Sequence, residues 1–272
     1  MRSLLIAGCG DLGIRLARRL DPDQWRICGL RRRPERLPEG IEAFGADLSS
    51  PRSLAGLEKE WDAVVYQATP GARDEDAYRR TYLEGPETLF AHVSTRRHVF
   101  VSSTAVYGQD DSGWVDETSP TEPTAFNGRI LVEAEHRMRS VAPESVAVRF
   151  SGIYGPGREY LIRSLRQGSA RCRREPPQWT NRIHANDCVG VLAHVLELQR
   201  PAPLYCATDH CPAPRCEVLE WLAERIGAPP PRELEPESGG GQGKRVANGR
   251  LLASGYAFQY PDYRTGYGTL VE

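Results

Sequence analysis

The sequence contains no apolar run that approaches the about 20 residues needed to cross a membrane. Its apolar opening segment, Ser3–Ala7, is also shorter than the about 7 to 15 residues of a signal-peptide core. The alternative reading of this segment is a lipoprotein signal with an acylated Cys9, and the short apolar run argues against it. We therefore expect a cytoplasmic protein that has no membrane partner.

An excess of charge of one sign is missing as well. The 35 Lys and Arg residues are balanced by 36 Asp and Glu residues, which gives a net charge of −1. A nucleic-acid-binding protein usually carries a basic excess on one face, so we expect no nucleic acid and instead a small-molecule ligand. With 272 residues, 40% of them hydrophobic, the chain can form one large domain or two modest ones.

Close cysteine pairs of the Cys-x-x-Cys type are absent. The seven cysteines are an odd number in a chain too large to need a disulfide framework, so we expect reduced thiols. Four residues that could bind a metal, Cys206, His210, Cys211 and Cys216, are interspersed with Pro212 and Pro214 and lack typical ligand spacing. We predict no metal site and interpret the cysteines as buried or incidental.

Short apolar runs alternate with amphipathic stretches, which predicts an α/β fold with a doubly wound parallel sheet of the Rossmann type. Strands are expected at Ser3–Ala7, Trp25–Leu30, Ile41–Gly45, Asp62–Ala68, His98–Ser103 and Ser145–Phe150. Helices are expected at Leu12–Leu20, Asp76–Ser94 with an interruption near Gly85-Pro86, Gly128–Val141, Glu159–Arg166, Asp187–Leu198 and Cys216–Ile226. We predict a nucleotide-binding domain over residues 1–155 and a smaller, interleaved α+β substrate region over 156–272, with a flexible loop near 227–245.

A glycine-rich turn follows the first predicted strand and opens the first predicted helix. It reads Gly8-Cys9-Gly10-Asp11-Leu12-Gly13, a G-x-G-x-x-G pattern, whose position in a βαβ unit indicates a dinucleotide site. Gly8 permits the tight turn, Gly10 leaves room for a pyrophosphate, and Gly13 lets the helix approach the strand. The helix N-terminus then offers free N–H groups to the anion. The alternative is a turn with a structural role alone.

An acidic residue is absent where the second strand ends, about 20 residues after the glycine turn, although a carboxylate there would bind the ribose of NAD. The strand ends instead in Arg31, Arg32 and Arg33. Guanidinium groups suit a 2′-phosphate, so the sequence favours NADP over NAD. The alternative is a solvated basic turn.

Four later segments give the chain a resemblance to the extended short-chain dehydrogenase/reductases, the NAD(P)-dependent epimerase/dehydratase family. The segments are GADL (Gly45–Leu48), VSSTAVYG (Val101–Gly108), VRFSGIYGPGR (Val148–Arg158) and NRIHANDCVGVL (Asn181–Leu192). The resemblance implies cofactor contacts from Asp47 and Leu48, from Ala68, Thr69 and Pro70, and from Ser102 and Ser151. It also implies that Ser103, four residues before Tyr107, is the catalytic serine. The alternative, if the resemblance is set aside, is that Ser102 and Ser103 are simply small residues that end a buried strand.

The chain departs from the family pattern where catalysis is concerned. The family uses a tyrosine followed four residues later by a lysine, and no Tyr-x-x-x-Lys occurs here; the matching positions are Ala125 and Arg129. Arg129 could still bind the ribose, but it would be a poor proton relay. Tyr107 and Tyr154 are the candidates for a displaced acid, because both follow strands at the ligand-binding edge of such sheets.

His184 is a weaker candidate for proton chemistry. We interpret it as a half-buried histidine bonded to a helix start that Asn186 or Asp187 caps. The chain resembles small bacterial nucleotide-sugar epimerase homologues in its tail too, which implies an oxidoreductase or epimerase acting on a nucleotide sugar or another small hydroxy or carbonyl compound. The alternative is a non-catalytic NADP(H)-binding sensor or interaction protein. Family analogy alone suggests a homodimer.

Overall fold

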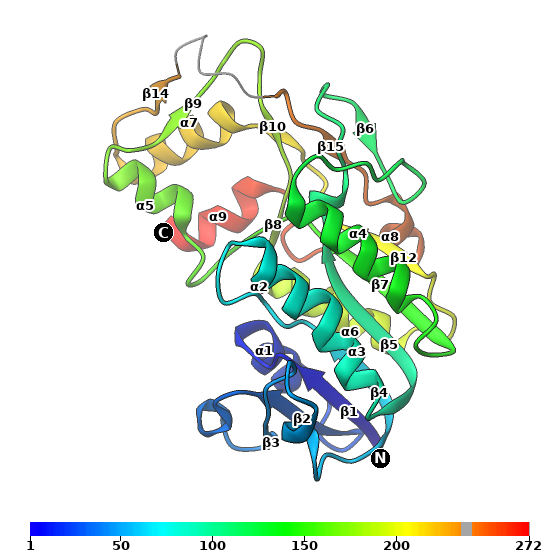
Figure 1. Cartoon of the computed structure of the whole chain (residues 1–272). Helices are drawn as coiled ribbons and strands as arrows, with labels where there is room; N and C mark the ends of the chain where they lie inside the picture. Colours follow the sequence, from blue (N-terminus) through cyan, green and yellow to red (C-terminus); the bar gives the residue numbers. More distant parts are fainter. Residues whose placement is uncertain (235–240, 272) are drawn as a thin grey trace. The chain divides into compact units, whose positions relative to one another are not determined.

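The computed structural model describes residues 1–234 and 241–271 (Figure 1). Its largest element is a seven-stranded sheet in the order β12-β7-β5-β4-β1-β2-β3. The strands are β1 (Arg2–Ala7), β2 (Trp25–Arg31), β3 (Glu42–Gly45), β4 (Glu60–Tyr66), β5 (Ser94–Ser103), β7 (Glu144–Phe150) and β12 (Leu204–Ala207). This order confirms the predicted Rossmann-type sheet, and the strand order reverses beside β1, which pairs in parallel with both β2 and β4.

The sheet residues are buried in continuous runs. Leu4 to Ala7 on β1 and Val64 to Tyr66 on β4 have no exposed surface. Strands covered by helices on both faces need apolar side chains on both faces, and this is why the sequence shows runs here rather than alternation. The expected strand at Asp62–Ala68 ends two residues early, at Tyr66, because its partner β1 ends at Ala7 and turns away at Gly8.

The helices associated with the sheet are α1 (Asp11–Arg19), α2 (Glu75–Arg79), α3 (Gly85–Phe90), α4 (Phe126–Met138) and α6 (Ala185–Glu197). The helix expected over Asp76–Ser94 is interrupted near Gly85-Pro86, as predicted. A π-helical turn over Arg80–Glu84 precedes this pair, and α3 begins at Gly85. Pro86 has no N–H to donate, so the ordinary helical bond is lost there and the turn widens before it. The helix ends at Phe90 because β5 already begins at Ser94.

The chain divides into two compact units, each of which is discontinuous in sequence. Unit 1 contains residues 1–106, 121–149 and 189–205; unit 2 contains residues 107–120, 150–188 and 206–272. The boundary expected at residue 155 stays a prediction. The loop expected near 227–245 lies partly outside the described residues, at 235–240. Among the described residues, no helix is both long and apolar enough to cross a bilayer.

Unit 2 is built from helices and short strand pairs. Its helices are α5 (Tyr160–Arg166), α7 (Arg215–Ile226), α8 (Gly249–Ala253) and α9 (Tyr263–Val271). Its short strands are β6 (Trp114–Val115), β8 (Gly152–Tyr154), β9 (Arg171–Cys172), β10 (Trp179–Thr180), β11 (Arg182–His184), β13 (Ala213–Pro214), β14 (Arg232–Glu233) and β15 (Arg245–Val246). Buried residues of α5, α7 and α9 share one apolar cluster that includes Ile162, Leu219 and Tyr267.

The expectation that all thiols are reduced is wrong for two cysteines of this unit. Cys172 on β9 and Cys216 on α7 form a disulfide, with their Cα atoms 5.3 Å apart and a separation of 44 positions in sequence. Packing of α7 against β9 brings them together, and the cysteine spacing could not show it. The other five cysteines form no disulfide among the described residues, and four of them are buried.

Reduction of this disulfide is expected to lower the free energy of unfolding by about 2–4 kcal/mol, because it releases a closed loop in the unfolded chain. Thermal melts with and without a reducing agent measure the effect, and the Cys172→Ala/Cys216→Ala double variant, which cannot form the bond, should melt at the same temperature under both conditions. Equal wild-type melts in both buffers, with both thiols free by mass spectrometry, would contradict the assignment.

Candidate functional site

Three loops of unit 1 meet at one edge of the sheet. In the parallel register Ala7 lies beside both Leu30 and Tyr66, so β1, β2 and β4 end at the same level. The glycine turn after β1, the arginines after β2 and the segment after β4 therefore lie together. This edge, beside the point where the strand order reverses, is where open α/β sheets bind their ligands.

Gly8 makes the tight turn that the sequence predicts. Its φ is +81°, and a Cβ atom there would lie 2.4 Å from the Cα of Ala68. The backbone N–H groups of Gly8 and Cys9 both donate to the carbonyl of Leu30, which fixes the turn against β2. A side chain at position 8 would therefore force the loops after β1 and β4 apart.

Gly13 is closely packed, whereas Gly10 lies beside open space. A Cβ atom at Gly13 would lie 2.2 Å from Nε2 of Gln67, so this glycine lets α1 pack closely on the sheet. A Cβ atom at Gly10 would meet nothing nearer than 3.9 Å, so the space beside it is open. Gly10 also caps α1 without a side-chain hydrogen bond from any described residue. A helix whose N-cap has no side chain and lies beside open space has the kind of start at which anions bind.

A cavity of about 840 Å³ lies over this turn. Of the residues predicted to contact a cofactor, its walls include Gly8, Gly10, Arg31, Arg32, Asp47, Leu48, Ala68 and Thr69; they do not include Asp11, Leu12, Gly13, Pro70, Ser102 and Ser151. The walls also contain residues that sequence reasoning missed, among them Arg36, Ser49, Tyr66, Arg80 and Thr81. Arg80 lies in the π-helical turn, far along the chain from the other arginines, and no local pattern marked it.

The cavity wall is strongly basic. Arg31, Arg32, Arg33, Arg36 and Arg80 line it, and Asp47 is the one acidic residue among the described wall residues. The Asp47 carboxylate is already engaged, because it accepts hydrogen bonds from the backbone N–H and the hydroxyl of Ser49 at 3.0 and 2.7 Å. These bonds and the nearby Arg32 charge lower the pKa of Asp47. The open space beside the glycine turn and the arginines of the wall fit the negatively charged phosphates of a dinucleotide.

A buried polar network lies at the end of β5. The hydroxyl of Ser102 donates to Oε1 of Glu135 at 2.6 Å, and Arg149 holds the same carboxylate with its Nε and Nη2 atoms at 2.9 and 2.6 Å. All three side chains are at most 5% exposed. The hydroxyl of Ser102 is therefore turned into the core, and any cofactor contact of this residue would come from its backbone.

Ser103 and Arg129 lie at more accessible positions of unit 1. Ser103 is partly exposed, and its hydroxyl accepts a hydrogen bond from the N–H of Ala105 at 3.2 Å. Arg129 is exposed in the first turn of α4 and donates to the carbonyl of Thr124. Ala125, at the position of the family tyrosine, is the residue that precedes α4. Its methyl group cannot donate or accept a proton.

The helix that carries Arg129 approaches the serine loop closely. A Cβ atom at Gly128 would lie 2.4 Å from the carbonyl oxygen of Ala105. The glycine therefore allows α4 to pack directly on the 3₁₀ turn over Thr104–Val106 that follows β5. Ser103 and the start of α4 are held side by side in this way.

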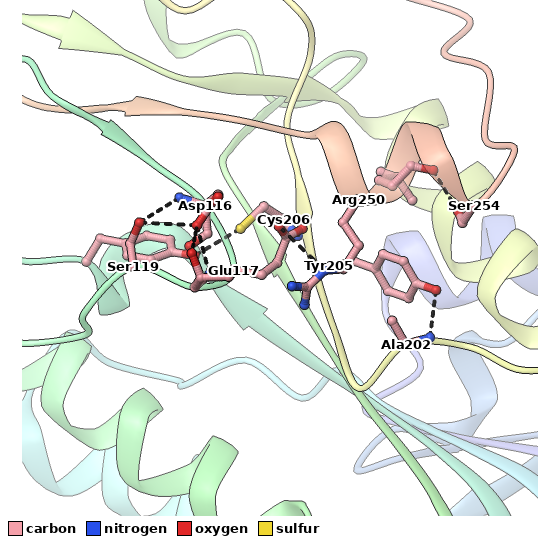
Figure 2. Close-up of polar contacts among 11 residues, drawn as sticks. Asp116, Glu117, Ser119, Ala202, Tyr205, Cys206, Arg250 and Ser254 are labelled. Carbon is pink, nitrogen blue, oxygen red and sulfur yellow. Dashed lines mark hydrogen bonds and ion pairs between the residues drawn. The ribbon is translucent and has the colours of Figure 1, made fainter.

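Tyr107, a predicted substitute for the missing acid, is 2% exposed. Its hydroxyl donates to the carbonyl of Asp116 at 2.7 Å and lies 3.0 Å from Sγ of Cys206. Figure 2 shows Cys206 beside Asp116 and Glu117, and the backbone N–H of Cys206 donates to Oε1 of Glu117 at 2.8 Å. These contacts place the phenol in the packed interior of unit 2, where it fixes the loop over 107–120.

Tyr154, the other predicted substitute, is buried among aromatic side chains of unit 2. Its ring stacks on Tyr267 with centroids 4.2 Å apart and meets His184 edge to face at 5.3 Å. Burial, together with the Asp209 carboxylate, raises the pKa of Tyr154 above its ordinary range. Gly266 is required at its hydroxyl, because a Cβ atom there would lie 1.8 Å away. A phenol with a raised pKa holds its proton more firmly, so Tyr154 in this position is a poor proton donor.

The cap expected at the start of α6 is wrong. The imidazole of His184 is itself the cap, because its Nδ1 accepts the N–H of Asn186 at 3.2 Å. The Asp187 carboxylate instead accepts hydrogen bonds from the hydroxyl of Tyr256 and from the backbone N–H groups of Gln259 and Tyr260. Asp187 thus fixes the segment before α9, a contact between positions about 70 residues apart that local capping rules could not anticipate.

Comparison with known proteins confirms the expected resemblance. The model of the NAD dependent epimerase/dehydratase family matches residues 4–203. Protein YeeZ of Escherichia coli (strain K12) is 30% identical over 281 aligned residues, which cover 96% of this chain and 97% of YeeZ. An NAD-dependent epimerase/dehydratase-like structure from Methylobacillus flagellatus is 36% identical with a TM-score of 0.82, and the match covers 99% of this chain and 97% of that one. The structure of human epimerase family protein SDR39U1 with NADPH, at 20% identity and a TM-score of 0.78, covers 100% of this chain and 99% of its own and shares the fold.

Proposed function

Because the chain belongs to the NAD dependent epimerase/dehydratase family, we propose that it binds NADP(H) in the cavity of unit 1 and uses it as an oxidoreductase or epimerase. The substrate would be a nucleotide sugar or another small hydroxy or carbonyl compound. The observation that carries the cofactor assignment is the cavity wall, where five arginines surround the open space over the glycine turn.

The preference for NADP(H) rests on those arginines rather than on the fold. The human relative is seen with NADPH, whereas a bacterial member with the same fold is seen with NAD, so the fold accommodates both cofactors. Arg31 ends β2 and Arg32 follows it, where a 2′-phosphate on the adenosine ribose would lie. The guanidinium fork matches a phosphate in geometry and charge.

The Arg31→Ala/Arg32→Ala variant is expected to bind NADPH about 10- to 100-fold more weakly, because each lost guanidinium removes a charged hydrogen bond to the 2′-phosphate. NADH, which lacks that phosphate, should bind the variant as it binds the wild type. Fluorescence titration of each cofactor measures both affinities. The Arg18→Ala/Arg19→Ala variant at the far end of α1, outside the cavity wall, is the charge-matched control. Tighter wild-type binding of NADH than of NADPH would overturn the preference.

Residues of unit 1 would also position the substrate and the nicotinamide ribose for the reaction. The bound nicotinamide would supply or accept a hydride at its C4 position. Ser103 would orient the substrate hydroxyl or carbonyl, and Arg129 would hold the ribose hydroxyls in place of the family lysine. Ala125 leaves the position of the proton-transferring tyrosine empty of a titratable group, so the proton step would need a residue or water from elsewhere.

A second candidate function is a sensor that binds NADP(H) without turning it over. The observation that favours it is the burial of both candidate phenols, since Tyr107 is 2% and Tyr154 3% exposed. Turnover assays with NADP and NADPH against nucleotide sugars, free sugars and small carbonyl compounds separate the two functions. Activity that Ser103→Ala abolishes and Thr104→Ala retains supports the enzyme, whereas cofactor binding without activity on any compound supports the sensor.

A further inference from the structure

We propose that the ammonium group of Lys244 in unit 2 is an anion-binding site that takes a phosphate or carboxylate group. The proposal rests on the proposed function only where it assigns this anion to a substrate. The binding site itself is argued from the contacts of Lys244 alone.

The backbone around Lys244 is clamped from two sides. The side-chain amide of Asn181 donates to the carbonyl of Lys244 at 2.8 Å, and its oxygen accepts the N–H of Val246 at 2.8 Å. The N–H of Gly243 donates to the Asp110 carboxylate at 2.7 Å. Residues Arg245 and Val246 then pair in parallel with β6. A side chain that leaves this segment therefore starts from a fixed position.

The Lys244 side chain is held at its far end too. Nζ donates to the carbonyl oxygen of Tyr107 at 2.6 Å. An ammonium group has three donors, and this carbonyl is the one acceptor found for it among the described residues. The other two N–H groups are therefore available to a ligand oxygen.

Lys244 is partly desolvated, and among the described residues Asp110 is the acidic group whose charge acts on it. The side chain is partly buried, and burial lowers the pKa of Lys244, while the Asp110 carboxylate counteracts this to a smaller extent. A desolvated ammonium is costly unless it is paired. A bound anion would offset this cost and return the pKa toward its ordinary value.

The neighbouring cation, Arg245, already contacts two aromatic rings and a backbone carbonyl, so Lys244 is the better candidate for binding an anion. The Arg245 guanidinium lies between the rings of Trp114 and Trp179, 5.2 and 4.8 Å from their centroids, and its Nε donates to the carbonyl of Ser112 at 2.8 Å. Only two of the 35 Lys and Arg residues of the chain are lysines. A compact ammonium can meet an oxygen from several directions, unlike the planar fork of arginine.

Because the chain has only two lysines, a chemical footprint, in which a bound anion protects a lysine from labelling, can test the proposal on the wild-type protein. The full chain, saturated with NADP so that the arginines of unit 1 are occupied, is labelled briefly with acetic anhydride in the presence of sodium pyrophosphate, sodium malonate or sodium chloride. Mass spectrometry then compares acetylation of Lys244 with that of Lys59. Either anion should slow labelling of Lys244 several-fold and leave Lys59 unchanged. Equal rates at Lys244 in all three salts would overturn the proposal, and the two anions together distinguish a phosphate site from a carboxylate site.

A variant series provides the second measurement. Calorimetric titration of the protecting anion should show about tenfold weaker binding to Lys244→Met than to the wild type, since one charged contact is lost. Lys59→Met is the matched control. Equal affinity of the two variants would overturn the proposal. If Lys244→Met melts early because the carbonyl of Tyr107 loses its donor, the wild-type footprint still decides.

The outcome is separable from that of the proposed function. NADPH is titrated into the same samples, and its site lies in unit 1, whereas Lys244 and its contacts belong to unit 2. Loss of NADPH binding with a retained footprint would remove the proposed function and leave the anion site. An absent footprint with normal NADPH binding would remove the anion site alone.

Discussion

Replacing Glu135 with alanine is expected to lower the free energy of unfolding by about 3–5 kcal/mol, because it leaves the buried Arg149 guanidinium without its counter-charge. Arg149 is 3% exposed, and Glu135 is the acidic group to which it is bonded. The substitution also removes the acceptor of the buried Ser102 hydroxyl, which donates to the same carboxylate. Denaturant unfolding of wild type and variant measures the difference.

The control for this prediction lies on the same helix. Glu133 pairs with Arg137 across one turn of α4, with both side chains 39% exposed. Exposed pairs of this kind contribute about 0.3–0.5 kcal/mol, so Glu133→Ala should be nearly neutral. Replacing the whole buried pair, as in Glu135→Leu/Arg149→Met, should recover most of the loss, because no uncompensated charge remains. A Glu135→Ala variant as stable as Glu133→Ala would show that the network does not carry this stability.

The strands that the sequence predicted best are those whose burial shows as an apolar run within the strand itself. Ser3–Ala7 and Ser145–Phe150 are apolar runs bounded by turn residues, and both are found within one residue as β1 and β7. The edge strand β12, Leu204–Ala207, was missed because it has only four residues beside a proline-rich stretch. Short strands at a sheet edge are defined by their partner rather than by their own pattern.

Contacts between distant positions explain most of what the sequence could not show. Glu135 occupies an ordinary polar position in a helical pattern, and only the approach of β5 and β7 makes it a buried counter-ion. The Cys172–Cys216 disulfide joins residues 44 positions apart for the same reason. The glycine turn could be anticipated because its requirements lie within six consecutive residues. The assignments of Ser103, Arg129 and the cofactor contacts remain predictions.

Replacing Gly10 with valine is expected to weaken NADPH binding at least about 1000-fold, equivalent to about 4 kcal/mol, while the melting temperature stays that of the wild type. The protein has room for a side chain at Gly10, but the bound cofactor would leave none. Within the protein, a Cβ atom meets nothing nearer than 3.9 Å, and Gly10 has extended backbone with a negative φ of −92°, so a side chain meets no left-handed strain there. Toward the cavity, the same side chain fills the space in which the pyrophosphate would approach the start of α1.

The size of the effect follows from the bonds that the side chain blocks. A pyrophosphate held by the helix start accepts several backbone N–H groups, and each such charged hydrogen bond contributes about 1.5–3 kcal/mol, so losing two removes most of the affinity. Gly249→Val, at an open position of α8 in unit 2, is the matched control and should leave NADPH affinity unchanged. Gly8→Val should instead destabilise the chain, since its positive φ and its contact with Ala68 leave no room for a side chain. If Gly10→Val binds NADPH like Gly249→Val, the glycine turn is structural and the cofactor must bind elsewhere.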